Sequence, residues 1–244
     1  MSQKIEILGV KIDNFTMQEV LKKIDKLLIK NQVESNLIIT ANSEMIINAY
    51  HNSKFNKIIN QAKFTVADGA GVLWAAKILG VTLKQRIAGV DLFEKILELA
   101  AKRAKKIYLL GAKPKVVKQA QIKIKAKLPK IKLKSHHGYL DKSLTKKVIA
   151  EIKAHQTDVL FVAMGSPLQE KWLAKNLAKL DVTIAMGVRG SFDIIAGAKK
   201  RAPVILQQLA LEWFYRLLQE PKRISRVATI PEFIFRVLIT KFSR

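Results

Sequence analysis

The sequence predicts an α/β protein with a doubly wound, mostly parallel, Rossmann-like sheet and a helical C-terminal appendage. From Lys106 onward, short apolar segments alternate with segments of helical length, and glycine-containing turns follow the apolar segments. This alternation is typical of parallel strands joined by right-handed helical crossovers. Residues 200–244 contain no glycine and are rich in arginine and aromatic side chains. We therefore expect an α/β catalytic domain over residues 1–199 and an appendage over residues 200–244.

The composition indicates a folded protein with a strongly basic surface. Its 244 residues, 49% of them hydrophobic, are enough to bury a full core. The absence of cysteine excludes disulfides, thiolate catalysis and zinc sites built on sulfur. No apolar run approaches the roughly 18 residues needed to cross a bilayer, so we expect a cytoplasmic protein that is soluble or attached to a surface. The formal charge of +25 favours a polyanionic partner: nucleic acid, anionic lipid or a phosphorylated substrate.

The first part of the chain predicts strands and helices in alternation. Ile7–Asp13 is expected to form one strand, and Asn14–Asn31 a helix with an Asn or Thr cap. A buried strand over Leu37–Thr40 follows, and it leads into a second helix. Phe64–Gly80 then predicts a short buried strand, a turn and an apolar helix.

Polar side chains stand where two of these strands end. Asp68 lies in the turn within Phe64–Gly80, and Thr40 and Asn42 end the preceding strand. Open α/β sheets bind ligands at the carboxyl ends of their strands, so Asp68 is our first candidate for chemistry. Thr40 and Asn42 could contact a sugar or phosphate. Helix capping explains the same residues, by Asp68 in one turn and by Asn42 or Ser43 in the other.

Arg86 lies in a connection between apolar segments, ahead of a helix expected from about Leu92 to Lys105. Its guanidinium could reach the site beside Asp68. A surface salt bridge would explain the same residue.

The second part of the chain repeats a pattern of strand, glycine turn and helix, with Pro114 suited to the first turn of one helix. The glycine turns should lie along one edge of the sheet, where backbone amides can approach a phosphate or ring. None of them is a complete Gly-x-Gly-x-x-Gly fingerprint or a Walker motif, so a nucleotide is favoured but a dinucleotide or ATP is not. The candidate substrate-binding residues in these turns are Gly111, Gly138, Tyr139, Gly165, Gln169 and Gly187.

The appendage carries six of the nine arginines. Because a guanidinium binds phosphate in bidentate fashion, the appendage is the better candidate for a phosphate contact. The segment 233–239 is apolar except for Arg236, so it must pack on the domain, on another subunit or against lipid. An anionic membrane surface and a homo-oligomer are therefore both expected partners.

Seven segments, in order over nearly the whole chain, carry a resemblance to one family. They are TAN (40–42), ADGAGVLWAAKILG (67–80), QRIAGVDL (85–92), IYLLGAKP (107–114), MGSPLQEKW (164–172), AGAKKRAP (196–203) and LEWFYRLLQEP (211–221). Each is weak individually, but their order and combination are specific. In these segments the chain resembles the WecG/TagA/CpsF family of bacterial glycosyltransferases, and most of all its TagA branch.

The resemblance implies a reaction and roles for several residues. It implies transfer of N-acetylmannosamine from UDP-N-acetylmannosamine to undecaprenyl-diphosphate-linked N-acetylglucosamine, which initiates the linkage unit of wall teichoic acid. Asp68 would be the general base, and Thr40 and Asn42 would position a sugar, Thr40 being counted as catalytic. Arg86 and Gln169 would line the same pocket. Arg216, Arg223 and Arg226 would contact the acceptor diphosphate at the membrane surface or the leaving UDP. Ser166 departs from the family pattern with little consequence. Arg189 and Gly190 also depart from it, so donor contacts around 187–192 are left unassigned.

The expected mechanism is metal-free. The sequence contains no Asp-x-Asp motif, so we expect no cofactor, departure of UDP stabilised by arginines and helix N-termini, and inversion in a single displacement. The acceptor lipid implies a peripheral position on the inner face of the cell membrane. Deletion of residues 200–244 is expected to abolish transfer and leave a folded domain.

Three alternatives are open at this stage. The same fold could transfer a different UDP-aminosugar, such as N-acetylmannosaminuronic acid, to a lipid-linked acceptor. The charge of +25 would suit a nucleic-acid-binding protein, but no motif of that class occurs and nucleic acid is not an expected partner. The apolar appendage would suit an oligomerisation module that binds no UDP.

Overall fold

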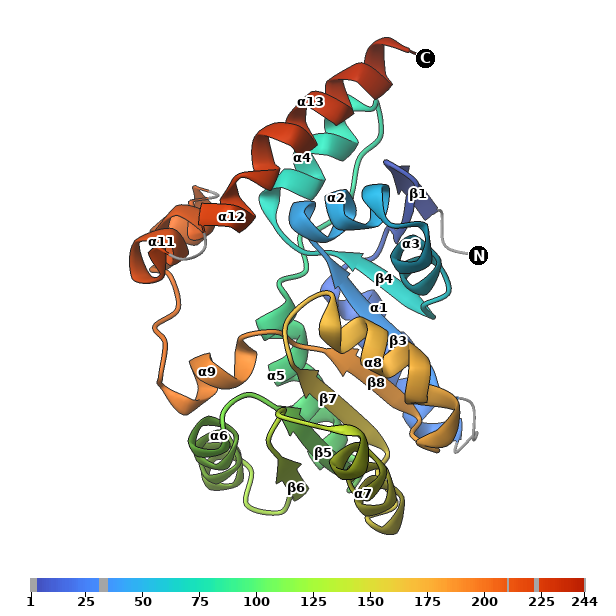
Figure 1. Cartoon of the computed structure of the whole chain (residues 1–244), viewed down its shortest axis with the longest axis vertical. Helices are drawn as coiled ribbons and strands as arrows, with labels where there is room; N and C mark the ends of the chain where they lie inside the picture. Colours follow the sequence, from blue (N-terminus) through green and yellow to red (C-terminus); the bar gives the residue numbers. More distant parts are fainter. Residues whose placement is uncertain (1–3, 31–34, 210, 222–223, 244) are drawn as a thin grey trace.

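A six-stranded parallel sheet forms the centre of the molecule (Figure 1). The computed structural model describes residues 4–30, 35–209, 211–221 and 224–243. The strand order is β4-β3-β8-β7-β5-β6, and every neighbouring pair is parallel, as the sequence predicts. The strands are β3 (Asn36–Ala41), β4 (Phe64–Ala67), β5 (Lys106–Gly111), β6 (Lys132–His136), β7 (Val159–Ala163) and β8 (Ile184–Gly187).

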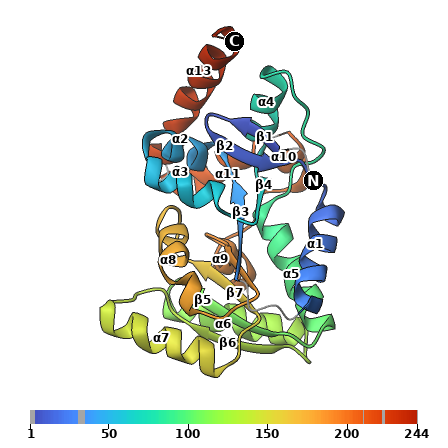
Figure 2. The same cartoon turned by 90° about the vertical axis from the view of Figure 1, so that its right-hand side faces the viewer.

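Helices cover both faces of this sheet, which confirms the doubly wound fold (Figures 1 and 2). The side chains of each strand alternate between two cores: in β5, Tyr108 and Leu110 face one and Ile107 and Leu109 the other. The first core packs against α2 (Ser43–His51), α3 (Ser53–Asn60), α4 (Ala70–Ile78), α7 (Lys142–Ala154) and α8 (Leu168–Asn176), which the 3₁₀ helix η1 (Leu177–Lys179) follows. The second packs against α1 (Met17–Lys30), α5 (Gly89–Lys102), α6 (Pro114–Lys127) and α9 (Ser191–Ala196).

The N-terminal strand is a hairpin, and the prediction of one strand over Ile7–Asp13 is wrong. β1 (Lys4–Ile7) and β2 (Val10–Asp13) pair antiparallel in a separate two-stranded sheet. Leu8 and Gly9 form the turn with φ of 48° and 80°, which is the backbone that a two-residue hairpin loop needs. The hairpin packs its apolar side chains into the first core.

Local signals explain where several helices begin. The first helix begins at Met17 rather than near Asn14, because Thr16 and Glu19 form a reciprocal capping box: Thr16 N donates to Glu19 Oε2 and Glu19 N to Thr16 Oγ1. Pro114 occupies the first turn of α6, as predicted. The predicted helices are thus present, but α1 begins later than expected, and α5, at Gly89–Lys102, lies ahead of the predicted range of about Leu92 to Lys105.

The appendage contains short helices followed by one long one. They are α10 (Val204–Gln208), α11 (Glu212–Gln219), α12 (Ile224–Val227) and α13 (Thr229–Phe242). α13 lies along α2 and α4 (Figure 1), and its Phe233 and Val237 are fully buried in the first core. The division at residue 199 stays a prediction, and removal of α13 would uncover part of the core beneath it.

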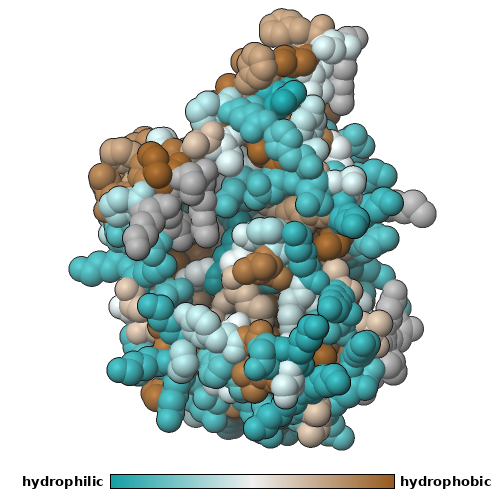
Figure 3. Space-filling model, in the orientation of Figure 1, coloured by the Kyte–Doolittle hydropathy of each residue, from teal (hydrophilic) through white to brown (hydrophobic). Residues whose placement is uncertain are grey.

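The rest of the appendage exposes many large apolar side chains. Figure 3 shows brown, hydrophobic side chains gathered over α11 and over the far end of α13. The exposed residues are Val204, Ile205, Leu209, Leu211, Trp213, Phe214, Leu218, Ile224, Ile234, Phe235, Ile239 and Phe242. Within the described ranges, no helix combines the length and the apolar character that a membrane span requires.

Candidate active site

Asp68, Thr40 and Arg189 meet at the carboxyl ends of three neighbouring strands. Arg189 Nη2 lies 2.9 Å from Asp68 Oδ2 and also donates to the carbonyl oxygen (2.6 Å) and the hydroxyl (3.0 Å) of Thr40. Asp68 follows β4, Thr40 lies near the end of β3, and Arg189 follows β8. The side chains of Asp68 and Arg189 are 23% and 19% exposed. A carboxylate and a guanidinium are thus both within reach of a ligand.

The sheet itself explains why these residues come together. Asp68 N donates to the carbonyl of Ala41, which extends the pairing of β3 and β4 by one residue and holds Asp68 at the sheet edge. β3 and β8 are neighbours, yet α2 follows one strand and α9 the other, on opposite faces of the sheet. Such a switch point is where open α/β sheets bind ligands.

Gly89, the first residue of α5, passes close to this cluster. A Cβ at this position would lie 3.0 Å from Thr40 Oγ1 and 3.3 Å from Asp68 Oδ2. The glycine allows the start of α5 to pack against both side chains, so α5 contributes to their placement.

Gln169 fixes the backbone of Arg189, and Glu170 orients the Gln169 amide. Gln169 is fully buried; its Oε1 accepts from Arg189 N at 3.0 Å, and its Nε2 donates to Glu170 Oε1 at 2.7 Å. Arg189 has a φ of 49°, a conformation that costs energy for a residue with a side chain. The bond from Gln169 therefore stabilises an otherwise unfavourable backbone. Gln169 was expected to line the substrate pocket, and its position fits a role in placing Arg189 instead.

Glu170 is a buried carboxyl group, only 2% exposed. Burial raises the pKa of the Glu170 carboxyl above its ordinary value, although the hydrogen bond from Gln169 favours the ionised form. The raised pKa favours the neutral acid in the folded protein, and the carbonyl oxygen of such an acid still accepts the bond from Gln169.

The structure shows which of Asn42 and Asp68 caps a helix with its side chain. Asn42 is the N-cap of α2, and its side chain accepts from Met45 N at 2.9 Å, so capping explains this residue. Asp68 does not cap α4: Gly69 is the N-cap and makes no side-chain capping bond. The capping interpretation of Asp68 is therefore wrong, and its carboxylate bonds to Arg189 instead.

Arg86 contacts the appendage. Its Nη2 lies 2.9 Å from Glu212 Oε2, and its Nη1 donates to the carbonyl of Gln207 at 3.2 Å. We considered a surface salt bridge for this residue, and the pair is instead partly buried between the domain and α10 and α11. The contacts recorded for Arg86 do not include the Asp68 cluster.

The glycine turns lie at the carboxyl edge, because each follows a strand of the parallel sheet. At two of these turns close backbone packing explains why the residue is glycine. A Cβ on Gly111 would overlap the backbone of Ala163, and one on Gly138 would lie 2.8 Å from the Cα of Gly111. Gly165 has a φ of 80°, which favours glycine. A Cβ on Gly187 would overlap the Gln169 amide.

Tyr139, beside Gly138, is 62% exposed, with its ring centroid 6.2 Å from that of His137. It is the candidate of this set that offers an open aromatic surface at the sheet edge. Its role as a substrate contact stays a prediction.

The three arginines proposed for diphosphate contact cannot be placed. Arg223 lies outside the described residues, and the side chains of Arg216 and Arg226 lie outside them as well. Among the residues that the structure describes, no three His, Asp or Glu side chains come together as metal ligands would. Metal independence stays a prediction.

Comparison with known proteins identifies the family. The model of the glycosyl transferase WecG/TagA/CpsF family matches residues 5–244. The chain belongs to this family. It is therefore a glycosyltransferase, as the seven sequence segments predict.

The family members to which the chain is similar include two staphylococcal enzymes. An N-acetylglucosaminyldiphosphoundecaprenol N-acetyl-beta-D-mannosaminyltransferase of Staphylococcus aureus strain MW2 is 41% identical, with 98% of this chain and 93% of the relative aligned. The enzyme of the same name from strain MRSA252 is 39% identical over the same shares of the two chains.

Two residues of this WecG/TagA/CpsF site are missing from the sequence prediction. Arg189 was treated as a departure from the family pattern, and Glu170 was not considered. Arg189 follows a glycine turn, where a basic residue is a usable signal for anion binding. Glu170 stands between Gln169 and Lys171 on a short helix, and nothing in this polar sequence context shows that it is buried.

Proposed function

We propose that this glycosyltransferase moves N-acetylmannosamine from UDP-N-acetylmannosamine to N-acetylglucosamine carried on undecaprenyl diphosphate, with inversion and without a metal. The observation that carries the proposal is the partly exposed Asp68 carboxylate at the carboxyl edge of the sheet, held by Arg189. The names of the staphylococcal relatives support the sugar and the acceptor. By the same likeness, the product would initiate the linkage unit of wall teichoic acid.

Asp68 acts as the general base in this proposal. A sugar hydroxyl is too weak an acid to attack unaided at neutral pH, and a positioned carboxylate typically contributes about 100- to 10,000-fold. The hydroxyl oxygen of the acceptor bonds to the anomeric carbon while its proton passes to Asp68. The bond from that carbon to the β-phosphate oxygen breaks, and its electron pair leaves with UDP. One displacement inverts the anomeric centre.

The appendage serves the lipid-linked acceptor. The acceptor's diphosphate stays at the membrane surface, where apolar side chains can enter the interface and basic ones meet phosphate. The exposed apolar residues over α11 and α13 (Figure 3), together with the excess of arginine in the appendage, support docking on an anionic membrane. In this proposal the enzyme acts peripherally on the inner face of the cell membrane.

Donor-by-acceptor turnover tests the proposal. The full chain is incubated with a short-chain polyprenyl-diphosphate N-acetylglucosamine and with UDP-N-acetylmannosamine, UDP-N-acetylglucosamine or UDP-N-acetylmannosaminuronic acid, with and without EDTA. We expect turnover with the first donor, unaffected by EDTA, and a product of inverted anomeric configuration. Turnover with UDP-N-acetylmannosaminuronic acid alone would show that this nucleotide sugar, and not UDP-N-acetylmannosamine, is the donor. Loss of turnover in EDTA would contradict metal independence, and absence of turnover with every donor would contradict the function.

A further inference from the structure

Nearly half of the formal charge of +25 lies in one segment outside the appendage. The segment from β5 to α7, residues 106–154, contains 14 of the 44 basic residues and 2 of the 19 acidic ones, a net charge of +12. The appendage, residues 200–244, contains 9 basic and 3 acidic residues, a net charge of +6. The membrane contact proposed for the appendage therefore leaves the larger concentration of charge without a role.

Helix α6 is the most one-sided element of this segment, because it has five lysines and no acidic residue. Lys115 lies in its first turn, where the helix dipole disfavours a cation, and Lys118 is three residues away, where like charges repel. Among the described residues, an ion pair is recorded for one of the five, Lys127, which reaches Glu94 and Glu98 of α5. The lysines of α6 thus cost the helix stability. All five are exposed: Lys115, Lys118, Lys123, Lys125 and Lys127.

The lysines of the neighbouring strand have a structural explanation that those of α6 lack. Lys132 and Lys134 are exposed on β6, which is the edge strand of the sheet. Charged side chains on an edge strand prevent it from pairing with another chain. The backbone of a helix needs no such protection, so an interaction has to explain the lysines of α6.

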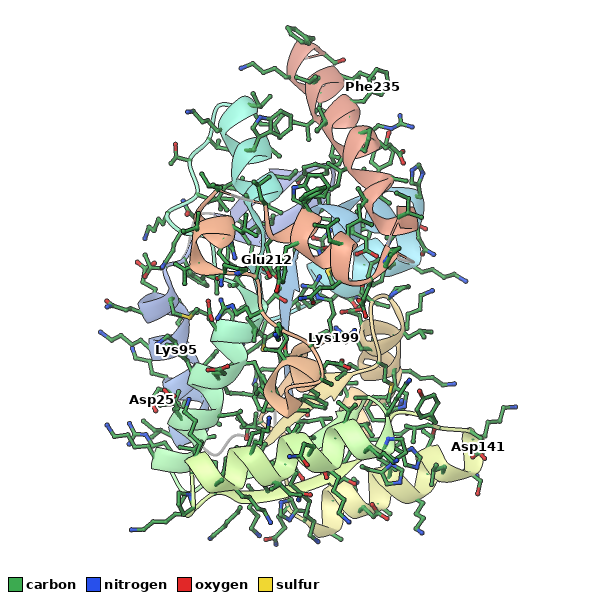
Figure 4. The ribbon with its side chains drawn as sticks, turned by 90° about the vertical axis from the view of Figure 1, so that its left-hand side faces the viewer. Asp25, Lys95, Asp141, Lys199, Glu212 and Phe235 are labelled. Atoms are coloured by element: carbon green, nitrogen blue, oxygen red, sulfur yellow. The ribbon has the colours of Figure 1, made fainter. Side chains whose placement is uncertain are left out.

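α6 lies on the same side of the molecule as α11. Figure 1 shows α6, α9 and α11 along one side, and Figure 4, which looks onto that side, shows α6 crossing it below the other two. α6 packs against α9, and a Cβ on Gly197, at the end of α9, would lie 2.7 Å from Lys123 Nζ. Trp213 and Phe214 of α11 are each 44% exposed. This side therefore combines a helix with exposed aromatic side chains and a helix with exposed lysines.

An anionic bilayer fits this combination. A lysine is a compact, strongly hydrated point charge, and it is attracted to an anionic lipid surface without shedding its water. Aromatic side chains enter the interface beside it. Nucleic-acid surfaces rely on arginine for base contacts and stacking, and all 14 basic residues of the segment 106–154 are lysines.

We propose that the lysines of α6 form a second membrane contact, which binds anionic lipid headgroups while the appendage inserts apolar side chains. This contact is electrostatic and needs no apolar insertion by α6. The inference rests on the proposed function for its partner, a lipid surface, and goes beyond it by assigning a surface outside the appendage. Two separate contacts hold the enzyme in one orientation on the bilayer.

The test measures sedimentation of the full chain with vesicles of phosphatidylcholine that contain increasing fractions of phosphatidylglycerol, at low and at physiological salt. The control variant removes three exposed lysines of α3 and α8, which cover the opposite face of the sheet from α6. The α6 variant carries Lys115→Gln, Lys118→Gln and Lys125→Gln. The control variant carries Lys54→Gln, Lys57→Gln and Lys175→Gln.

At low salt and high phosphatidylglycerol, we expect the α6 variant to bind about 10- to 100-fold more weakly than the unmodified chain, and the control variant within about twofold of it. The difference should shrink as salt is added, because salt screens exposed charges, and it should vanish on phosphatidylcholine alone. The α6 variant should melt no lower than the unmodified chain, because it removes like-charge repulsion from one helix.

Unchanged vesicle binding by the α6 variant would overturn the inference. Equal losses in the two variants would also overturn it, because the attraction would then be spread over the whole surface. Loss of binding to a labelled RNA with unchanged vesicle binding would assign the surface to nucleic acid instead.

Transfer to the short-chain acceptor tests the proposed function separately. If the unmodified chain transfers sugar but does not bind anionic vesicles, the inference fails alone. If it binds vesicles through α6 but transfers sugar from no donor, the proposed function fails alone.

Discussion

Arg86 and Glu212 form a partly buried ion pair, 2.9 Å between Nη2 and Oε2, that joins the connection before α5 to α11 of the appendage. Their side chains are 21% and 17% exposed. Figure 4 shows Glu212 on the side of α11 that faces the middle of the molecule. This pair attaches the appendage to the segment that leads from Asp68 to Gly89, so the position of α11 and the geometry of the site are linked.

If this link matters for catalysis, the two residues should behave as one unit. We expect Arg86→Gln and Glu212→Gln to lower transfer by similar factors, and the double variant to lose little more than either. The coupling energy for stability should be on the order of 1 kcal/mol, measured in urea unfolding with a double-mutant cycle. A much larger loss of transfer in Arg86→Gln than in Glu212→Gln would instead show that Arg86 contacts substrate directly.

Replacement of Asp68 by asparagine tests the general base. Asp68→Asn keeps the size of the side chain but cannot accept the proton, so kcat should fall about 100- to 10,000-fold with UDP affinity nearly unchanged. Turnover and calorimetry measure the two quantities. Asp25→Asn, which breaks a distant ion pair with Arg103, is the control and should retain full turnover. Substantial turnover in Asp68→Asn would reject the assigned role.

Gly187 and Gly190 offer a matched pair of substitutions in one loop. A Cβ on Gly187 would overlap the buried Gln169 amide, whereas one on Gly190 would meet its nearest neighbour at 3.9 Å. We expect Gly187→Ala to destabilise the fold by about 1–3 kcal/mol and to lower transfer, because displacing Gln169 shifts Arg189, the partner of Asp68. Gly190→Ala should unfold at nearly the original temperature. Equal melting temperatures for the two variants would contradict the packing argument.

Glu170 should make stability depend on pH. Its pKa is raised in the folded protein, so between the ordinary value of 4.5 and the folded value the native state holds more protons than the unfolded state. The stability contributed by the neutral acid is complete below pH 4.5 and is lost as pH rises through the folded pKa.

Glu170→Gln removes this titration. In urea unfolding from pH 4 to pH 8, its stability relative to the unmodified chain should rise with pH, by up to about 1.4 kcal/mol per pH unit. The variant keeps the oxygen that accepts from Gln169, so UDP affinity should change little. A stability difference that stays constant with pH would show that Glu170 is ionised in the fold.

The exposed apolar residues of α13 test membrane docking. Phe235 and Ile239 are 60% and 43% exposed, and Figure 4 shows Phe235 on the outer side of α13. Changing both to serine should weaken binding to phosphatidylglycerol vesicles about tenfold or more in a sedimentation assay. Ile29 and Ile122, exposed on α1 and α6, provide the control pair. Equal losses for the two pairs would show that α13 is not the docking surface.

The sequence predicts the parallel sheet well because its signals are local. Buried strands such as Val159–Ala163 are continuous apolar runs, and the helices between them begin at recognisable caps such as Asn42. The hairpin was missed because its turn, Leu8 and Gly9, contains a single glycine, which is a weak turn signal. Apolar residues alternate on both sides of this turn, as they would in one continuous strand. Periodicity alone does not separate one strand from two.

The site was predicted less completely because its contacts join distant parts of the chain. Asp68 could be selected at a strand end, but its partner Arg189 lies more than a hundred residues away, after β8. Asn42 was expected in the site, and it caps α2 because local capping satisfies its side chain. The burial of Gln169 depends on the glycine at position 187, which leaves room for its amide, and only the packed structure reveals this.

The packing of Phe233 and Val237 against α2 and α4 has a consequence for folding during synthesis. Ile5 of the first hairpin and Phe233 of α13 share one core, although a ribosome adds them at widely separated times. α2 and α4 cannot bury the surface that Phe233 and Val237 cover before α13 is synthesised, and contacts of such long sequence separation form slowly. Completion of this core therefore depends on α13, and before α13 is made the nascent chain exposes the apolar surface that Phe233 and Val237 later cover.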